Sequence, residues 1–243
     1  MCKMKLLGGP QIWLLCGAIC VVLAVSLAGC ARSPRLHERV LPLSIEIEGP
    51  GLLISPLLFG VNLGHYDQAL VKGAGPQPGG VDRLRAGGFA LLKYPGGLAA
   101  DRYRWNAPIN DTADVDTSAF LALSRVTGSE PVITVNSLAG PELAAAWVRY
   151  TNRAPGPDVR YWEFGDETWG SWAAGHTDPA TYVARFRAAH AAMKAVNPTL
   201  RLAANVSLDP SQGSRWNRPV ITGLQEILEA VSFTFFPQEP GEE

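Results

Sequence analysis

The sequence alternates short apolar runs with longer segments of helical spacing, and this alternation leaves few folds open to the chain. The apolar runs are 57–63, 89–94, 131–135, 159–164, 200–206 and 230–236. The segments with helical patterns lie between them, at 81–87, 116–126, 141–150, 178–196 and 220–229. Runs this short and apolar are typical of strands covered on both faces. The order predicts an α/β fold with a parallel sheet.

Local signals support several of these boundaries. Asp178 and Pro179 are a cap and a first-turn proline at the start of the longest helix, and Gly128 follows the end of another. The stretch 73–80 is so rich in Gly and Pro that it is predicted to be a loop.

Two parallel architectures fit this order, an open doubly wound sheet and a (β/α)8 barrel. Residues suited to function follow the ends of five strands, and this spread favours the barrel, because an open sheet concentrates its site at one switch point. These residues are Asn62, Pro95 to Gly97, Asn136, Asp166 with Glu167, and Asn205. Since six strands are found where a barrel has eight, the prediction is an incomplete (β/α)8 barrel of about six units at 49–243.

The amino terminus is predicted to be an export signal. Lys3 and Lys5 precede an apolar run at 12–27, and the run closes with Leu-Ala-Gly before Cys30. This pattern resembles the cleavage site of bacterial lipoproteins, which implies a signal peptide at 1–29 and a lipid on Cys30. Residues 30–48 would be a tether and lead-in, and the protein would be held on the periplasmic or cell-surface side of the envelope. An uncleaved signal anchor is the alternative.

Composition excludes several other classes of function. All four cysteines lie at or before Cys30, so the predicted domain has neither a disulfide nor a cysteine metal site. The four histidines show no metal-ligand spacing. A net charge of −1 without a basic cluster argues against nucleic acid as a partner. Because the sequence also lacks a phosphate-binding loop and a dinucleotide fingerprint, no cofactor is expected.

One stretch, 159–172, combines a predicted buried strand with acidic and aromatic side chains. Gly165 breaks the strand, Asp166 and Glu167 follow, and Trp169 and Trp172 come next. Carboxyl groups can transfer protons at a glycosidic oxygen, and indole rings can stack on a sugar face. The stretch therefore favours a carbohydrate site. The alternative interpretation is that the acidic pair only caps a helix.

Three segments resemble α-L-arabinofuranosidase-like glycoside hydrolases. Residues 91–105, LLKYPGGLAADRYRW, resemble the RYPGG…D-Y-W segment after the second strand of that family. Residues 159–172, VRYWEFGDETWGSW, resemble its KYWEIGNE…GSW segment, and 230–238, AVSFTFFPQ, resemble its sixth-strand FVSVHYYPQ. The resemblance implies a retaining glycosidase that acts on oligosaccharide or polysaccharide. Glu167 falls on the acid/base position, and the family's nucleophile follows a seventh strand.

The departures from the family pattern are also informative. Asp166 stands where the family has an Asn that donates a hydrogen bond to a sugar hydroxyl, and an ionised Asp can only accept. Thr234 and Phe235 replace a His and a Tyr, and Leu98 stands where relatives often have a polar residue. None of the terminal glutamates, Glu239, Glu242 and Glu243, matches the context of the nucleophile.

The sequence therefore predicts a truncated relative that lacks the nucleophile, with little or no hydrolysis of aryl arabinofuranosides. Two alternatives remain open: a non-catalytic carbohydrate-binding lipoprotein on a degenerate barrel, and a purely structural envelope lipoprotein.

Other residues complete the predicted sugar site. Asp101 matches a family position and is expected either to bind a hydroxyl or to brace its loop through Arg102 or Arg104. Trp105 is expected to line the pocket or to enter the core. The full set predicted to contact substrate is Asp166, Trp169, Trp172, Asn136, Asp101 and Trp105.

Overall fold

The computed structural model describes residues 53–64, 69–72, 75–107, 115–156 and 158–235. The chain divides into two units, 1–52 and 53–243, and every described residue lies in the second. The predicted signal peptide at 1–29, the lipidation site Cys30, the tether at 30–48 and the terminal glutamates lie outside the described residues.

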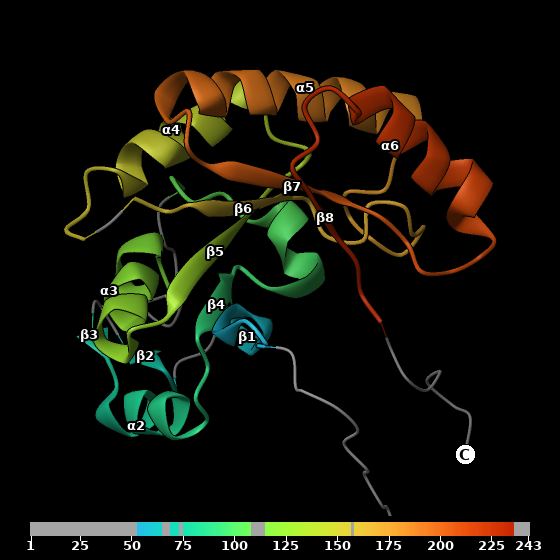
Figure 1. Cartoon of the computed structure of the whole chain (residues 1–243). Helices are drawn as coiled ribbons and strands as arrows, with labels where there is room; N and C mark the ends of the chain where they lie inside the picture. The colour runs from blue at the N-terminus through green and yellow to red at the C-terminus, as the bar shows by residue number, and fades with distance from the viewer. Residues whose placement is uncertain (1–52, 65–68, 73–74, 108–114, 157, 236–243) are drawn as a thin grey trace, which may run out of the picture. The chain divides into compact units, whose positions relative to one another are not determined.

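The main sheet in the described part of the chain has six strands in the order β1-β4-β5-β6-β7-β8. All neighbouring strands are parallel. The strands span, in the same order, Gly60–Asn62, Leu91–Tyr94, Glu130–Val135, Tyr161–Phe164, Arg201–Asn205 and Ala230–Ser232. The sheet is curved, with helices outside the curve (Figure 1). This is the arrangement of an incomplete (β/α)8 barrel, and the predicted fold is confirmed.

Helices connect the successive strands. They are α2 (Pro78–Ala86), α3 (Thr117–Thr127), α4 (Pro141–Thr151), α5 (Pro179–Val196) and α6 (Arg218–Leu224), with 3₁₀ turns η1 (Pro56–Leu58) and η2 (Gly97–Arg102) and a π turn η3 (Gly213–Asn217). In Figure 1, α4, α5 and α6 form an arc over β6, β7 and β8, and α5 packs against both of its neighbours.

The ends of the helices follow the sequence signals. Asp178 accepts a hydrogen bond from the Thr181 backbone N–H at 2.9 Å and so caps α5. Gly128 follows α3 with a φ of 76°, the left-handed conformation that glycine adopts without a steric penalty.

Alternate residues of each strand point to opposite faces of the sheet. In β4, Leu92 and Tyr94 are fully buried in the hydrophobic core, whereas Leu91 and Lys93 line a groove on the other face. The prediction that strands are apolar because both faces are covered is therefore wrong for the inner face. That face carries charged side chains because it borders the groove.

Four local predictions are wrong in detail. The sixth strand is predicted at 230–236, but β8 ends at Ser232. The first strand is predicted to be buried from 57 to 63, but Leu57, Leu58 and Phe59 are exposed and only Gly60–Asn62 is strand, because β1 is the edge of the sheet. The predicted loop at 73–80 contains β3 (Gly75–Pro76), which pairs with β2 (Val71–Lys72), and the first turn of α2. The last helix ends at Leu224 rather than Glu229. Within the described residues, no helix has the length and apolar character needed to span a membrane.

Candidate active site

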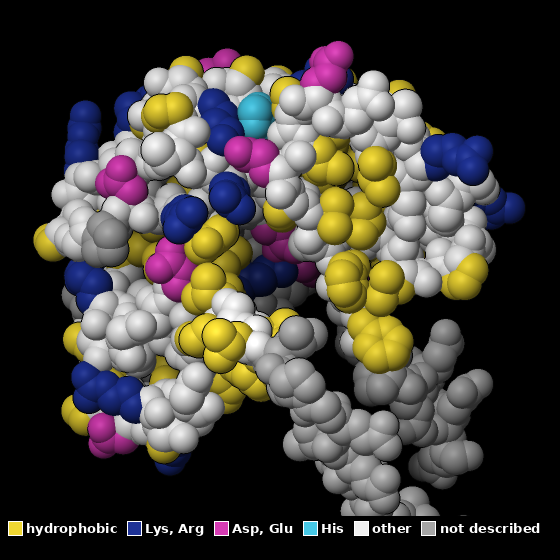
Figure 2. All heavy atoms as spheres, viewed as in Figure 1, with side chains coloured by type: hydrophobic (Ala, Val, Ile, Leu, Met, Phe, Trp, Pro, Cys, Tyr) yellow, Lys and Arg dark blue, Asp and Glu magenta, His cyan; other side chains and the backbone are white. Residues whose placement is uncertain are grey.

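Polar side chains from several strands gather at the carboxyl edge of the sheet. Asn62 ends β1 and Asn205 ends β7, while Asn136 directly follows β5 and Asp166 lies two residues beyond β6. A groove of about 790 Å³ borders this edge and continues along the inner face of the sheet. Its lining includes Asn62, Lys93, Leu98, Glu163, Asp166 and Glu167. In the space-filling view, acidic and basic side chains are visible inside a hollow whose margins carry hydrophobic side chains (Figure 2).

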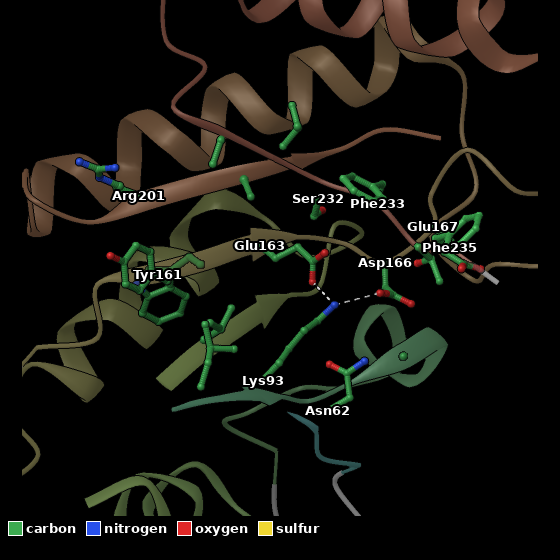
Figure 3. Close-up of a pocket in the computed structure, with 18 of the residues that line it drawn as sticks. Asn62, Lys93, Tyr161, Glu163, Asp166, Glu167, Arg201, Ser232, Phe233 and Phe235 are labelled. Carbon is green, nitrogen blue, oxygen red and sulfur yellow. Dashed lines mark hydrogen bonds and ion pairs between the residues drawn. The ribbon is translucent and has the colours of Figure 1, made fainter. Parts of the chain in front are cut away.

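A lysine joins two carboxylates on the floor of this groove (Figure 3). Lys93 Nζ, from β4, forms an ion pair with Glu163 Oε2, from β6, and lies 3.2 Å from Asp166 Oδ1. Thr134 Oγ1 donates a further hydrogen bond to Glu163 Oε2 at 3.0 Å. Burial by itself would lower the pKa of Lys93, but the charges of Glu163 and Asp166 outweigh it and the pKa is raised. Lys93 is therefore held as a cation.

Asp101 ties together the loops that follow three strands. Its Oδ1 accepts hydrogen bonds from the Ser137 backbone N–H at 2.7 Å and from Ser137 Oγ at 2.6 Å, and its Oδ2 accepts one from the Asp166 N–H at 3.0 Å. Burial raises the pKa of Asp101, against the lowering effect of these hydrogen bonds. The carboxylate braces its surroundings as one alternative expected, but through Ser137 and Asp166 rather than through a neighbouring arginine.

Replacing Asp101 by Ala should therefore destabilise the protein and disturb the turn that carries Asp166. The change leaves the buried N–H groups of Ser137 and Asp166 without an acceptor, at about 1–3 kcal/mol each. Urea denaturation measures the loss. The matched control is Asp209→Ala, because Asp209 accepts the same pair of bonds from Ser211 on an exposed loop. Equal, small effects of the two substitutions would contradict the bracing role.

The turn after β6 requires unusual backbone geometry. Gly165 has a φ of 71°, and a Cβ at this position would lie 2.5 Å from Thr168 Cγ2. Glu167 also has a positive φ, 48°, which is uncommon for a residue other than glycine. Such strain, of about 1–3 kcal/mol, is concentrated at functional sites in proteins. The expectation that Asp166 and Glu167 cap a helix is wrong, because the next helix, α5, begins only at Pro179.

The side chain of Glu167 is oriented by a tryptophan. Trp172 Nε1 donates a hydrogen bond to Glu167 Oε2 at 2.8 Å. The Trp172 ring packs edge-to-face with Trp169, with ring centroids 5.0 Å apart. Trp169 is half-buried, whereas Trp172 is 57% exposed. Trp172 is thus the more exposed of the two indoles. Neither indole lines the groove, and Trp169 lines a small cavity together with Glu167 and Asn205.

Of the six residues predicted to contact substrate, Asp166 alone lines the groove. The other five, Asp101, Asn136, Trp105, Trp169 and Trp172, lie outside its lining. Asn136 is buried, with its Nδ2 donating to the Tyr103 carbonyl and its Oδ1 accepting from the Leu138 N–H. Trp105 donates to the Leu143 carbonyl at 3.2 Å and stacks on the core residue Trp147. The structure thus brings Asp166 and Glu167 into the groove and places Asn136 and Trp105 in supporting packing.

Lys93 and Glu163, which line the groove, were not predicted from the sequence. The available signal was the presence of a charged residue inside each of two otherwise apolar strands. No group of His, Cys, Asp and Glu side chains within the described ranges is arranged to hold a metal ion.

The sequence relatives of the chain are α-L-arabinofuranosidases. No protein-family model matches the chain. An intracellular exo-α-(1→5)-L-arabinofuranosidase of Bifidobacterium longum is 27% identical over 187 residues, which are 63% of this chain and 33% of that protein. α-L-Arabinofuranosidase C of Emericella nidulans is 25% identical over 144 residues, 46% of this chain and 29% of that protein. The chain thus spans about a third of the length of these relatives.

Solved structures agree with the sequence relatives. A family 51 α-L-arabinofuranosidase from Bifidobacterium longum superimposes with a TM-score of 0.63 at 25% identity, over 73% of this chain and 43% of that one. An α-L-arabinofuranosidase from Thermotoga maritima, in complex with arabinose, has the same fold, with a TM-score of 0.59 at 21% identity over 72% of this chain and 44% of that one. Over the part that aligns, the chain is therefore homologous to family 51 α-L-arabinofuranosidases at low identity.

Proposed function

We propose that the groove binds α-L-arabinofuranosyl units of an oligosaccharide or polysaccharide, and that Glu167 is the general acid/base of a retaining glycoside hydrolase. The observation that carries this proposal is the placement of Asp166 and Glu167 in the groove at the carboxyl edge of the sheet. Enzymes with (β/α)8 barrels hold their catalytic groups at this edge. The choice of sugar follows from the homologous proteins, which are α-L-arabinofuranosidases.

Glu167 is suited to proton transfer by its position. It is half-buried, it borders the groove, and one of its carboxyl oxygens is fixed by the Trp172 indole. The other oxygen is then the one that would carry the proton toward a glycosidic oxygen. Retention also needs a second carboxylate about 5–5.5 Å away as nucleophile. Glu163 and Asp166 are both paired with Lys93, so neither is proposed for that role.

A second candidate is a protein that binds the sugar without cleaving it. The observation that favours it is this same pairing, because Lys93 engages both other carboxylates of the groove lining. Either function requires arabinofuranosyl binding, and the two differ in turnover.

Calorimetric titration with α-(1→5)-linked arabino-oligosaccharides tests the shared requirement. The native chain should bind, and Trp172→Ala should weaken binding about fivefold, because loss of a stacking contact costs roughly 1 kcal/mol. Trp172 is exposed, so the fold should tolerate the change. Tyr150→Ala, which removes an exposed ring near the end of α4, is the control. Absence of binding by the native chain would rule out both candidates.

We also propose that the protein is a lipoprotein of the bacterial cell envelope, held on the periplasmic or cell-surface side by a lipid on Cys30. The support is the Leu-Ala-Gly-Cys sequence that ends the apolar leader. Metabolic labelling with a fatty acid should mark the native chain and leave Cys30→Ala unlabelled. Labelling of the variant would remove this proposal.

A further inference from the structure

The ammonium group of Lys93 can donate one further hydrogen bond in the groove. A lysine ammonium carries three N–H donors. One is directed to Glu163 and one to Asp166, and no third partner is found for Nζ among the described residues. The side chain remains 18% exposed and lines the groove. Figure 3 shows the amino group of Lys93 at the end of its side chain, between the carboxylates of Glu163 and Asp166.

Asp166 offers a matching acceptor beside it. Its Oδ1 is occupied by Lys93, and its backbone N–H by Asp101. Its Oδ2 takes part in none of the hydrogen bonds found within the described residues, and the side chain keeps 10% of its surface exposed on the groove lining. An ammonium donor and a carboxylate acceptor therefore lie side by side, and each can form a further hydrogen bond.

We propose that Lys93 is a sugar-binding residue, which acts with Asp166 as a donor–acceptor pair for neighbouring ring hydroxyls. Lys93 Nζ donates to one hydroxyl oxygen, and the adjacent hydroxyl donates to Asp166 Oδ2. This inference rests on the proposed function, since it takes the groove to be the sugar site. It adds a specificity-determining residue on β4, on the opposite side of β5 from the strand that leads to Glu167.

The surroundings of the pair are rigid, which favours this role. Glu163 holds Lys93 from β6, and Asp101 holds the backbone of Asp166. Groups fixed before binding lose little conformational entropy when a ligand arrives. Hydrogen bonds to charged groups are also stronger than those between neutral groups, and partial burial strengthens them further.

Deoxy sugars test the pair directly. NMR titrations would compare methyl α-L-arabinofuranoside with its 2-deoxy and 3-deoxy analogues. For the native chain, removal of a recognised hydroxyl should weaken binding about tenfold or more. In Lys93→Met/Glu163→Gln, which keeps the net charge of the three groups unchanged, this discrimination should fall toward onefold. Arg201→Met removes another cation from the groove lining and should leave the discrimination intact. Unchanged discrimination in the double variant would overturn the proposal.

A second measurement needs no substitution. The side-chain ammonium signal of Lys93 should shift when methyl α-L-arabinofuranoside is added, and it should shift less with one of the deoxy analogues. Binding without a shift of this signal would contradict the role of Lys93 while leaving the proposed function in place. Failure of the native chain to bind any of the glycosides would overturn both.

Discussion

Where the native chain hydrolyses arabino-oligosaccharides, Glu167→Gln should reduce that hydrolysis by about 10²–10⁴-fold, the usual contribution of general acid–base catalysis. The amide keeps the shape of the side chain and can still accept the Trp172 N–H, but it has no acidic proton to give. Affinity for the oligosaccharide should therefore change little. The measurement is kcat/KM for native and variant chains.

The leaving group distinguishes an acid from a merely structural residue. Aryl arabinofuranosides need little protonation as they depart, so Glu167→Gln should affect their cleavage far less than that of oligosaccharides. Glu142→Gln is the control, because Glu142 is an exposed glutamate in the first turn of α4. Equal losses on the two substrates would contradict the acid role. Binding without turnover in the native chain would favour the non-catalytic candidate.

Lys93→Met should lower the free energy of unfolding by about 3–5 kcal/mol, because removal of one partner leaves buried charges uncompensated. Here Glu163 and Asp166 would lose their shared cation, and both are at least nine-tenths buried. Removing Lys93 is therefore strongly destabilising, although buried ion pairs of this kind add little net stability compared with well-packed apolar side chains.

Denaturant titrations measure this loss. Lys93→Met/Glu163→Gln should recover part of it, since one of the two unpaired charges is gone. Glu226→Gln breaks the exposed pair with Arg187, and it should cost no more than about 1 kcal/mol. A Lys93→Met variant as stable as Glu226→Gln would show that the buried network does not support the fold.

The sequence was sufficient for those features that depend on local patterns. Apolar runs separated by helical segments predicted the parallel sheet, and the cap at Asp178 predicted the start of α5. The carboxyl-edge site was also predictable, because parallel strands end at the same edge and each polar residue either ends a strand or follows it within three residues. Asp166 and Glu167 lie in the groove for this reason.

Contacts between distant segments were not predictable. Lys93 and Glu163 are seventy positions apart in the sequence, and their side chains form an ion pair across the intervening strand β5. A contact over this separation leaves no trace in the local sequence pattern. Its neighbours in the sequence suggested an arginine partner for Asp101, whereas the fold brings Ser137 to it from the loop after β5. The sequence did not distinguish a pocket position from a core position for Trp105. In the structure its indole N–H donates a hydrogen bond to the carbonyl of Leu143 on α4.

The most direct test of the sugar site is an NMR map of binding on the native chain. Addition of an α-(1→5)-linked arabino-oligosaccharide should shift the amide signals of Gly165, Asp166 and Glu167 and the indole N–H signal of Trp172, and an equal amount of xylo-oligosaccharide should shift them much less. Unchanged signals at these four groups, or changes confined to the separate cavity beside Ser124 and Arg125, would contradict an arabinofuranoside site at the carboxyl edge of the sheet.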